Sequence, residues 1–223
     1  MKEQVSPRVS GRALAVVLIA FPLAYLVNSG MPWSRRFTAE GDHAYYLPFL
    51  VSIMLLHWLS VAVAWRVARA HGYDLSGLGL VTSPRRALVV GAVLVLVAGL
   101  GVATRELYPA QEPLLRIPPA GLHLDGWVER AWWVPFSFTA AFCEEFVYRG
   151  FGITALRSRG HPSWRAVALA STSWCLVHGL GGVLLFPAYF IAGVGFSALF
   201  LWRRSLVPVM VVHVLIVLTV LGS

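Results

Sequence analysis

The sequence predicts an all-α protein, a polytopic bundle of transmembrane helices that forms one integral membrane domain over residues 1–223. Composition is the first reason, because 58% of the residues are apolar and 13% are charged. Soluble domains contain about 45–50% apolar and about 25% charged residues. Spacing is the second reason, because the apolar residues gather in runs that approach the roughly 20 residues needed to cross a hydrocarbon layer. About seven spans are expected, and about six to eight are compatible with the pattern.

Seven runs carry this signal, separated by short polar connectors: Ala13–Val27, Ala44–Val67, Ala87–Thr104, Ala131–Leu156, Trp164–His178, Gly182–Trp202 and Leu206–Leu221. The first run follows basic residues, as a secretory signal does, but no small-residue cleavage site follows it, so we expect an uncleaved span. The longest connector, Arg105–Arg130, contains four prolines and is expected to be an interfacial loop. In the sixth run, Gly193 and Ser197 offer a small-residue face for helix packing.

The distribution of basic residues favours an N-terminus in the cytoplasm and a C-terminus outside. With that orientation, twelve Lys and Arg residues fall in cytoplasmic segments and five fall outside. The cytoplasmic ones are Lys2, Arg8, Arg12, Arg66, Arg69, Arg85, Arg86, Arg157, Arg159, Arg165, Arg203 and Arg204, and the outer ones are Arg35, Arg36, Arg105, Arg116 and Arg130. Basic residues clustered in connectors are typical of topology signals, so the net charge of +8 does not indicate nucleic-acid binding.

Residue usage bears on location and redox state. Lys2 is the only lysine, and Ala, Val, Leu and Gly are abundant, which is typical of a GC-rich bacterium. We therefore expect the bacterial cytoplasmic (inner) membrane. Cys143 and Cys175 both lie in apolar runs and are expected to pack as small hydrophobic side chains rather than to form a disulfide.

Three charged residues interrupt the fourth run: Glu144, Glu145 and Arg149. A charge near the bilayer centre costs about 2.5–3.5 kcal/mol even on lenient insertion scales, so such residues indicate a functional site. On a helix with about 100° per residue, Glu145 and Arg149 lie within about 40° of each other and can form an i,i+4 pair. Glu144 points about 140° away from Arg149 and is left to face another helix. A carboxylate there could take and give protons.

Histidines provide the groups that Glu144 could face. Counted at about 1.5 Å per residue from the cytoplasmic ends, Glu144 lies about 18 Å deep, His178 about 21 Å and His213 about 12 Å. Packing of the fourth, fifth and seventh runs would then bring one carboxylate and two imidazoles around a common cavity, where they could polarise a water molecule. His57, in the second run, is expected to be a packing residue with a satisfied hydrogen bond, and the Glu145–Arg149 pair is expected to be structural.

These residues resemble the motifs of the CAAX-protease and bacteriocin-processing family of intramembrane glutamic proteases, which includes abortive-infection proteins. The first motif, two glutamates followed by three residues and an arginine, appears as Glu144-Glu145-Phe-Val-Tyr-Arg149. The second, an aromatic residue four positions before a histidine, appears as Trp174 and His178, with tryptophan in place of phenylalanine. The third begins with a histidine in a late span, matched by His213. The motif-bearing core covers about residues 131–221.

The resemblance implies an intramembrane endopeptidase without a cofactor. Glu144 would be the catalytic base, His178 would hold and activate the water, and His213 would complete the site. Glu145, Arg149 and Trp174 would support the pocket. One position departs from the family: Val217 stands four residues after His213, where many members have asparagine or another polar residue. Loss of such an oxyanion donor costs about 2.7–4 kcal/mol of transition-state stabilisation unless another group replaces it.

Other functions remain open on the sequence alone. Glu144, His178 and His213 could instead bind zinc as three ligands with an open position, although the H-E-x-x-H spacing of zinc proteases is missing. Embedded Glu, His and Arg residues also build proton relays in transporters, although no internal repeat is visible. A non-catalytic scaffold or immunity protein is a further alternative. For a protease, the expected partners are the lipid bilayer and a membrane-tethered protein or peptide with a C-terminal tail, sorting tag or leader to be cleaved.

Overall fold

The computed structural model describes residues 8–80, 124 and 126–222, and every regular element in these ranges is a helix. The N-terminal elements are α1 (Gly11–Ala15), η1 (Val16–Ala20), α2 (Phe21–Ser29), α3 (Pro32–Thr38), η2 (His43–Tyr45) and α4 (Tyr46–Ala70). The C-terminal elements are α6 (Gly126–Glu144), η3 (Glu145–Ile153), α7 (Thr154–Ser158), α8 (Ser163–Cys175), η4 (Leu176–His178), α9 (Gly179–Leu184), α10 (Phe186–Arg203), α11 (Val207–Leu218) and η5 (Thr219–Gly222). The expected all-α bundle is confirmed.

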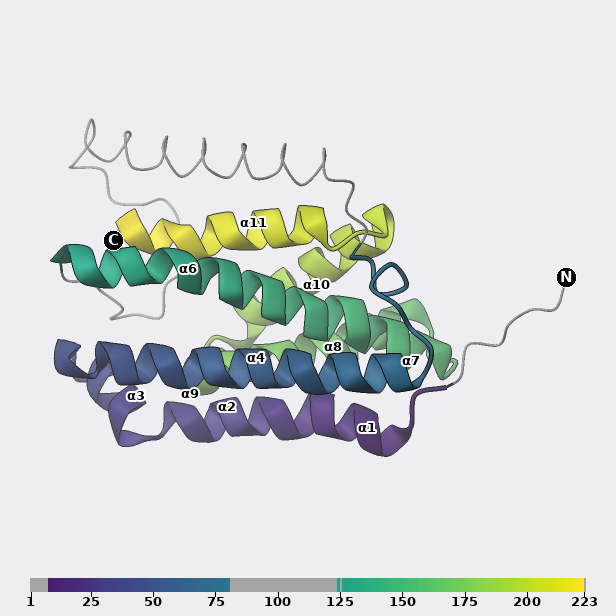
Figure 1. Cartoon of the computed structure of the whole chain (residues 1–223), viewed down its shortest axis with the longest axis horizontal. Coiled ribbons are helices and arrows are strands. Elements are labelled where there is room, and N and C mark those ends of the chain that lie inside the picture. Colours follow the sequence, from purple (N-terminus) through teal and green to yellow (C-terminus); the bar gives the residue numbers. More distant parts are fainter. Residues whose placement is uncertain (1–7, 81–123, 125, 223) are drawn as a thin grey trace, which may run out of the picture.

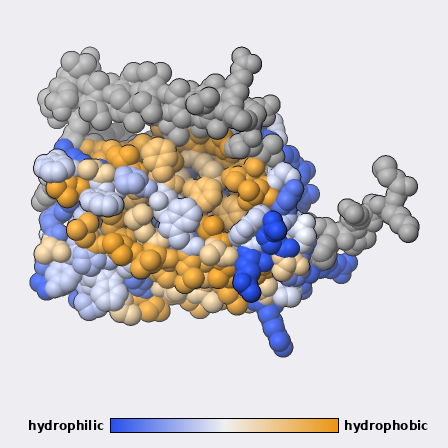
Figure 2. All heavy atoms as spheres, in the orientation of Figure 1, coloured by the Kyte–Doolittle hydropathy of each residue, from blue (hydrophilic) through white to orange (hydrophobic). Residues whose placement is uncertain are grey.

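The long helices lie side by side with their axes roughly parallel, so the bundle has two polar ends and an apolar middle (Figure 1, Figure 2). Four helical segments are long and apolar enough to cross a membrane: Gly11–Ser29, His43–Ala70, Ser163–Leu184 and Phe186–Arg203. Large apolar side chains face outward, as Leu55 and Ile191 do at 67% and 71% exposure. A lipid environment explains this exposure, because the acyl chains of lipids solvate apolar side chains that water would not.

The expected spans are roughly consistent with the described helices, with differences at the ends. The third run, Ala87–Thr104, lies outside the described residues. The fourth run belongs to a continuous helical segment that extends from Gly126 to Ser158. The seventh run, Leu206–Leu221, contains the shorter apolar helix α11. The boundary placed between the fifth and sixth runs is wrong: α9 continues to Leu184 and α10 begins only at Phe186.

The turn at Gly179 explains this shifted boundary. Gly179 has φ +61°, which ends the η4 turn at His178, and α9 then folds back against the end of α8. Gly182 lies so close to the carbonyl oxygen of Cys175 that no β-carbon fits there. The chain therefore reverses at the depth of His178 through a compact turn, after which α10 packs antiparallel against α8.

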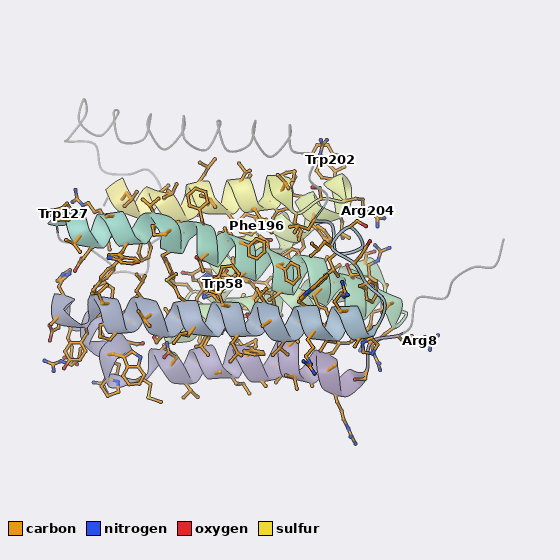
Figure 3. All side chains as sticks on the ribbon, in the orientation of Figure 1. Arg8, Trp58, Trp127, Phe196, Trp202 and Arg204 are labelled. Carbon is orange, nitrogen blue, oxygen red and sulfur yellow. The ribbon has the colours of Figure 1, made fainter. Side chains whose placement is uncertain are left out.

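The arginines separate the two ends of the bundle. One end carries the start of α1, the end of α4 and the α7–α8 and α10–α11 connections, with Arg8, Arg12, Arg66, Arg69, Arg157, Arg159, Arg165, Arg203 and Arg204. The other end carries α3 and the start of α6, with Arg35, Arg36 and Arg130. Figure 3 shows Arg8 and Arg204 at the first end and Trp127 at the second. The bundle thus has an arginine-rich end and an arginine-poor end.

Candidate active site

The two motif glutamates lie at the junction where an α-helix changes to a π-helix. Glu144 is the last residue of α6, and Glu145 is the first residue of the π-helical segment η3. Wider π-helical turns inside an α-helix occur frequently at functional sites because they redirect side chains. Both carboxylates are buried, with Glu144 at 5% exposure and Glu145 at 0%.

Glu145 and Arg149 form the expected pair, with Arg149 Nη1 3.1 Å from Glu145 Oε1. Arg149 is fully buried, and its Nη2 donates to the backbone carbonyl of Gly193 at 3.3 Å. Its guanidinium also lies 4.4 Å from the centre of the Trp174 ring. A β-carbon at Gly193 would come within 3.0 Å of both Ser171 and Trp174, so the small residue lets α10 approach the site closely.

Glu144 faces three other helices, not one. The indole N–H of Trp174, on α8, donates to Glu144 Oε2. His57, on α4, places Nε2 2.9 Å from Glu144 Oε1. His213, on α11, places Nε2 3.8 Å from Glu144 Oε2 and Nδ1 2.8 Å from Glu145 Oε1. The imidazole of His213 therefore lies between the two carboxylates, whereas the imidazole of His57 contacts Glu144 alone.

His57 was expected to be a packing residue with a satisfied hydrogen bond; it is buried and hydrogen-bonded, but it also contacts Glu144, which was not expected. Its Nδ1 lies 2.9 Å from the carbonyl oxygen of Ile53, which can only accept a hydrogen bond, so Nδ1 carries a proton. A neutral His57 would then turn an unprotonated Nε2 towards Glu144. The 2.9 Å contact thus requires one more proton, either on His57 Nε2 or on Glu144. The sequence did hold one signal for this role, because an ionisable residue inside a span is by default functional.

His178 lies beside this cluster but does not touch Glu144. Its Nδ1 is 3.3 Å from the carbonyl oxygen of Trp174, so Nδ1 carries the proton and Nε2 of the neutral ring has a free lone pair. Its ring packs edge-on against Trp174, with centroids 4.8 Å apart, and lies tilted over the ring of Tyr189, with centroids 4.0 Å apart. No hydrogen bond or ion pair joins His178 to Glu144, although the two interact electrostatically. His178 is half-buried, whereas Glu144, His57 and His213 are buried.

Two departures from the motif pattern have different structural consequences. Trp174 supplies an N–H donor to Glu144, a contact that phenylalanine could not make. Val217 packs with an apolar cluster around Trp133 and Phe136, and its backbone carbonyl accepts the indole N–H of Trp133 at 3.0 Å. The position four residues after His213, which is polar in many family members, therefore contributes no polar side chain to the cluster around Glu144.

The alternative of a zinc centre does not fit these side chains. Within the described ranges, no three His, Cys, Asp or Glu residues are arranged as metal ligands. Both oxygens of Glu144 are already hydrogen-bonded to protein groups, Oε1 to His57 and Oε2 to Trp174, and His178 makes no direct contact with this carboxylate.

The fold and this cluster define a class: a polytopic helical membrane protein with a buried site of carboxylate, imidazole and indole groups. Residues 126–219 match the model of the family described as type II CAAX prenyl endopeptidase Rce1-like. This segment is therefore similar to the CAAX-protease family that the three motifs indicated, and the four apolar helices indicate an integral membrane protein. No curated protein and no solved structure matches the chain significantly.

Proposed function

We propose that the protein is a glutamic-type intramembrane endopeptidase that hydrolyses a peptide bond of a membrane-tethered protein or peptide. One observation carries the proposal: a buried carboxylate, Glu144, is surrounded by imidazole and indole groups from three other helices. Such an arrangement holds a polar site within an apolar bundle, where preorganised dipoles act in a low dielectric and stabilise developing charge strongly.

In the proposed reaction, one water molecule lies between Glu144 and the free Nε2 of His178. Glu144 takes one proton of the water, His178 Nε2 accepts the hydrogen bond of the other O–H, and the water oxygen bonds to the scissile carbonyl carbon. When the tetrahedral intermediate collapses, the C–N bond breaks and the proton on Glu144 passes to the leaving nitrogen. His57, which shares a proton with Glu144, keeps the carboxylate oriented during this exchange.

The oxyanion needs donors that Val217 does not provide. His213, when doubly protonated, presents an Nε2–H on the Glu144 side of the cluster. Tyr189 is the second donor we propose, because its ring lies 4.0 Å from that of His178 and it interacts electrostatically with Glu144. Its hydroxyl makes no hydrogen bond to any described residue. Tyr189→Phe is expected to lower kcat about 100-fold with little change in KM, as loss of an oxyanion donor does.

The remaining details of the proposal concern location and substrate. The arginine-rich end faces the cytoplasm of a bacterial inner membrane, following the positive-inside rule. The family description names CAAX prenyl endopeptidases, and for this chain a C-terminal tail, sorting tag or leader peptide is the proposed substrate class. Alkaline-phosphatase fusions at the first residues of α3 and at the α7–α8 connection would test the orientation, with activity expected only from the α3 fusion.

The test of function begins in cells. Membrane proteins from cells producing the wild type or Glu144→Gln are compared by mass spectrometry of their new termini, and the cleaved peptide is then assayed with purified protein in vesicles. Glu144→Gln and His178→Ala are expected to abolish cleavage while the protein still inserts. His161→Ala, in the α7–α8 connection, is the control and should retain full activity. Full activity of either site variant would refute the mechanism.

Two further measurements separate the alternatives. Activity that survives a strong chelator supports the metal-free site, and loss that zinc restores would replace it with a metalloprotease. Glu144-dependent proton flux into vesicles, with no cleavage of any membrane peptide, would indicate a transporter in place of a protease.

A further inference from the structure

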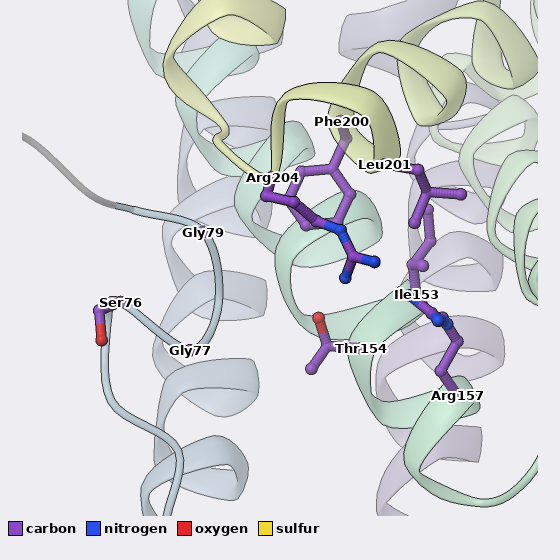
Figure 4. A pocket seen from close by; sticks show the side chains of 9 residues that line it. All are labelled: Ser76, Gly77, Gly79, Ile153, Thr154, Arg157, Phe200, Leu201 and Arg204. Carbon is purple, nitrogen blue, oxygen red and sulfur yellow. The ribbon is translucent and has the colours of Figure 1, made fainter.

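A pocket of about 380 Å³ opens at the arginine-rich end of the bundle, away from Glu144. It lies between the loop after α4, the η3–α7 helix and the end of α10. Its lining residues are Ser76, Gly77, Gly79, Ile153, Thr154, Arg157, Phe200, Leu201 and Arg204 (Figure 4). The pocket thus combines guanidinium and hydroxyl groups with an apolar floor.

The charges in this pocket are uncompensated by the described part of the chain. The side chains of Arg157 and Arg204 make no ion pair or hydrogen bond with any described residue. Figure 4 shows their guanidinium groups beside the same space, with the hydroxyl of Thr154 nearby. Asp74, in the adjoining loop, does not pair with either arginine. The backbone N–H of Gly77 and the hydroxyl of Ser76 donate to its carboxylate and hold its pKa below the ordinary value. Two cations that share a pocket favour an anionic ligand.

The backbone of Arg204 adopts a left-handed conformation that is energetically unfavourable for a residue with a β-carbon. Arg204 has φ +52°, and it is the only residue other than glycine with positive φ in the described ranges. Its backbone N–H caps α10 by donating to the carbonyl of Phe200 at 2.7 Å. Glycine is the usual residue for such a left-handed helix end, because a β-carbon is disfavoured there. A residue held in a strained conformation is a reason to look for a role of its side chain.

A second cavity, of about 310 Å³, meets the pocket at Leu201. It is a groove between α8 and α10, lined by Ser163, Trp164, Val167, Ala168, Val194, Ala198 and Leu201. Except for Ser163 these are apolar or aromatic residues. Val194, Ala198 and Leu201 follow one face of α10 at spacings of four and three, so the groove extends from the arginine-rich end towards the membrane interior.

We propose that this composite site binds one anionic phospholipid, with its phosphate between Arg157 and Arg204 and an acyl chain in the groove between α8 and α10. Leu201 lines both the head-group pocket and the chain groove, so the two cavities adjoin and one lipid molecule can reach both. A free phosphate would use only the pocket and a neutral lipid only the groove, whereas an anionic phospholipid satisfies both. Basic pockets between transmembrane helices on the cytoplasmic side are a recognised place for lipid head groups.

The experiment measures lipid retention by the whole protein. The protein is reconstituted in nanodiscs of equal parts phosphatidylglycerol and phosphatidylcholine, extracted mildly, and examined by native mass spectrometry for bound lipid. The wild type should retain one phosphatidylglycerol in preference to phosphatidylcholine. Arg157→Gln combined with Arg204→Gly should lower that retention at least about tenfold, since each basic contact strengthens lipid binding. Glycine at position 204 suits the positive φ, so this variant is expected to fold.

Matched variants separate the two halves of the site. Arg203→Gln removes a neighbouring exposed arginine that packs on Trp202 outside the pocket, and it should leave retention unchanged. Ala198→Phe fills the groove and should lower retention, whereas Ala188→Phe, exposed on the same helix, should not. Equal loss with Arg203→Gln would overturn the site, because general surface charge would explain it. Displacement of the lipid by inorganic phosphate alone would overturn the lipid assignment, and displacement only by a lipidated peptide would make the site a substrate subsite instead.

Discussion

The contact between His57 and Glu144 gives the sharpest test of the site. Both side chains are buried, at 2% and 5% exposure, and their nearest atoms are 2.9 Å apart. His57→Leu removes the imidazole with little change in volume and leaves Glu144 with the donor of Trp174 and the more distant His213. Breaking a buried pair by removal of one partner costs about 3–5 kcal/mol. Because Glu144 keeps these other partners, we expect the lower end of that range, about 3 kcal/mol.

The same helix offers a matched control. His71 also donates from Nδ1 to the backbone carbonyl four residues earlier, at 2.8 Å from Val67, and it has no carboxylate partner among the described residues. His71→Leu therefore loses only a partly exposed hydrogen bond and should cost about 1 kcal/mol or less. The difference between the two variants isolates the contact with Glu144.

A double-mutant cycle completes this measurement. Unfolding of the purified protein by SDS is monitored by circular dichroism for the wild type, His57→Leu, Glu144→Gln and the double variant. The double variant should recover much of the stability lost in His57→Leu, with a coupling energy of about 1–3 kcal/mol. A coupling energy below about 0.5 kcal/mol, or equal losses for His57→Leu and His71→Leu, would refute the pairing.

Two further predictions concern the α8–α9 region. Trp174→Phe keeps an aromatic ring beside Arg149 but deletes the donor to Glu144, so kcat/KM should fall about 10- to 100-fold, while Trp58→Phe on the lipid-exposed surface should have no effect. Unchanged kcat/KM in Trp174→Phe would show that the hydrogen bond is dispensable. Gly182→Ala places a methyl group against the Cys175 carbonyl and within 3.0 Å of the His178 β-carbon, so it should lower the SDS-unfolding midpoint and activity together. Gly195→Ala, with no atom within 4 Å, should stabilise the protein by about 0.5–1 kcal/mol, and equal effects of the two alanines would contradict the turn.

The sequence by itself determined the features that depend on local spacing. Apolar runs of the right length predicted the helices, since each span satisfies its own backbone hydrogen bonds. The i,i+4 spacing predicted the Glu145–Arg149 pair, which the structure contains at 3.1 Å. The depth count placed Glu144, His178 and His213 in one layer, and the structure brings their helices around a common cluster.

Only the tertiary structure decided which groups touch Glu144. His57 and the indole of Trp174 make its hydrogen bonds, whereas His178, the residue expected beside it, stands further away against Tyr189. The physical reason is that lipid and the bundle interior are equally apolar, so hydrophobic patterning does not tell which face of a span meets another helix. Close contact of small residues selects the neighbours instead. Gly193 lets α10 pack directly against the side chains of Ser171 and Trp174, and Gly182 lets the chain fold against the backbone of Cys175. These contacts help to fix the orientation of the helices that carry the site.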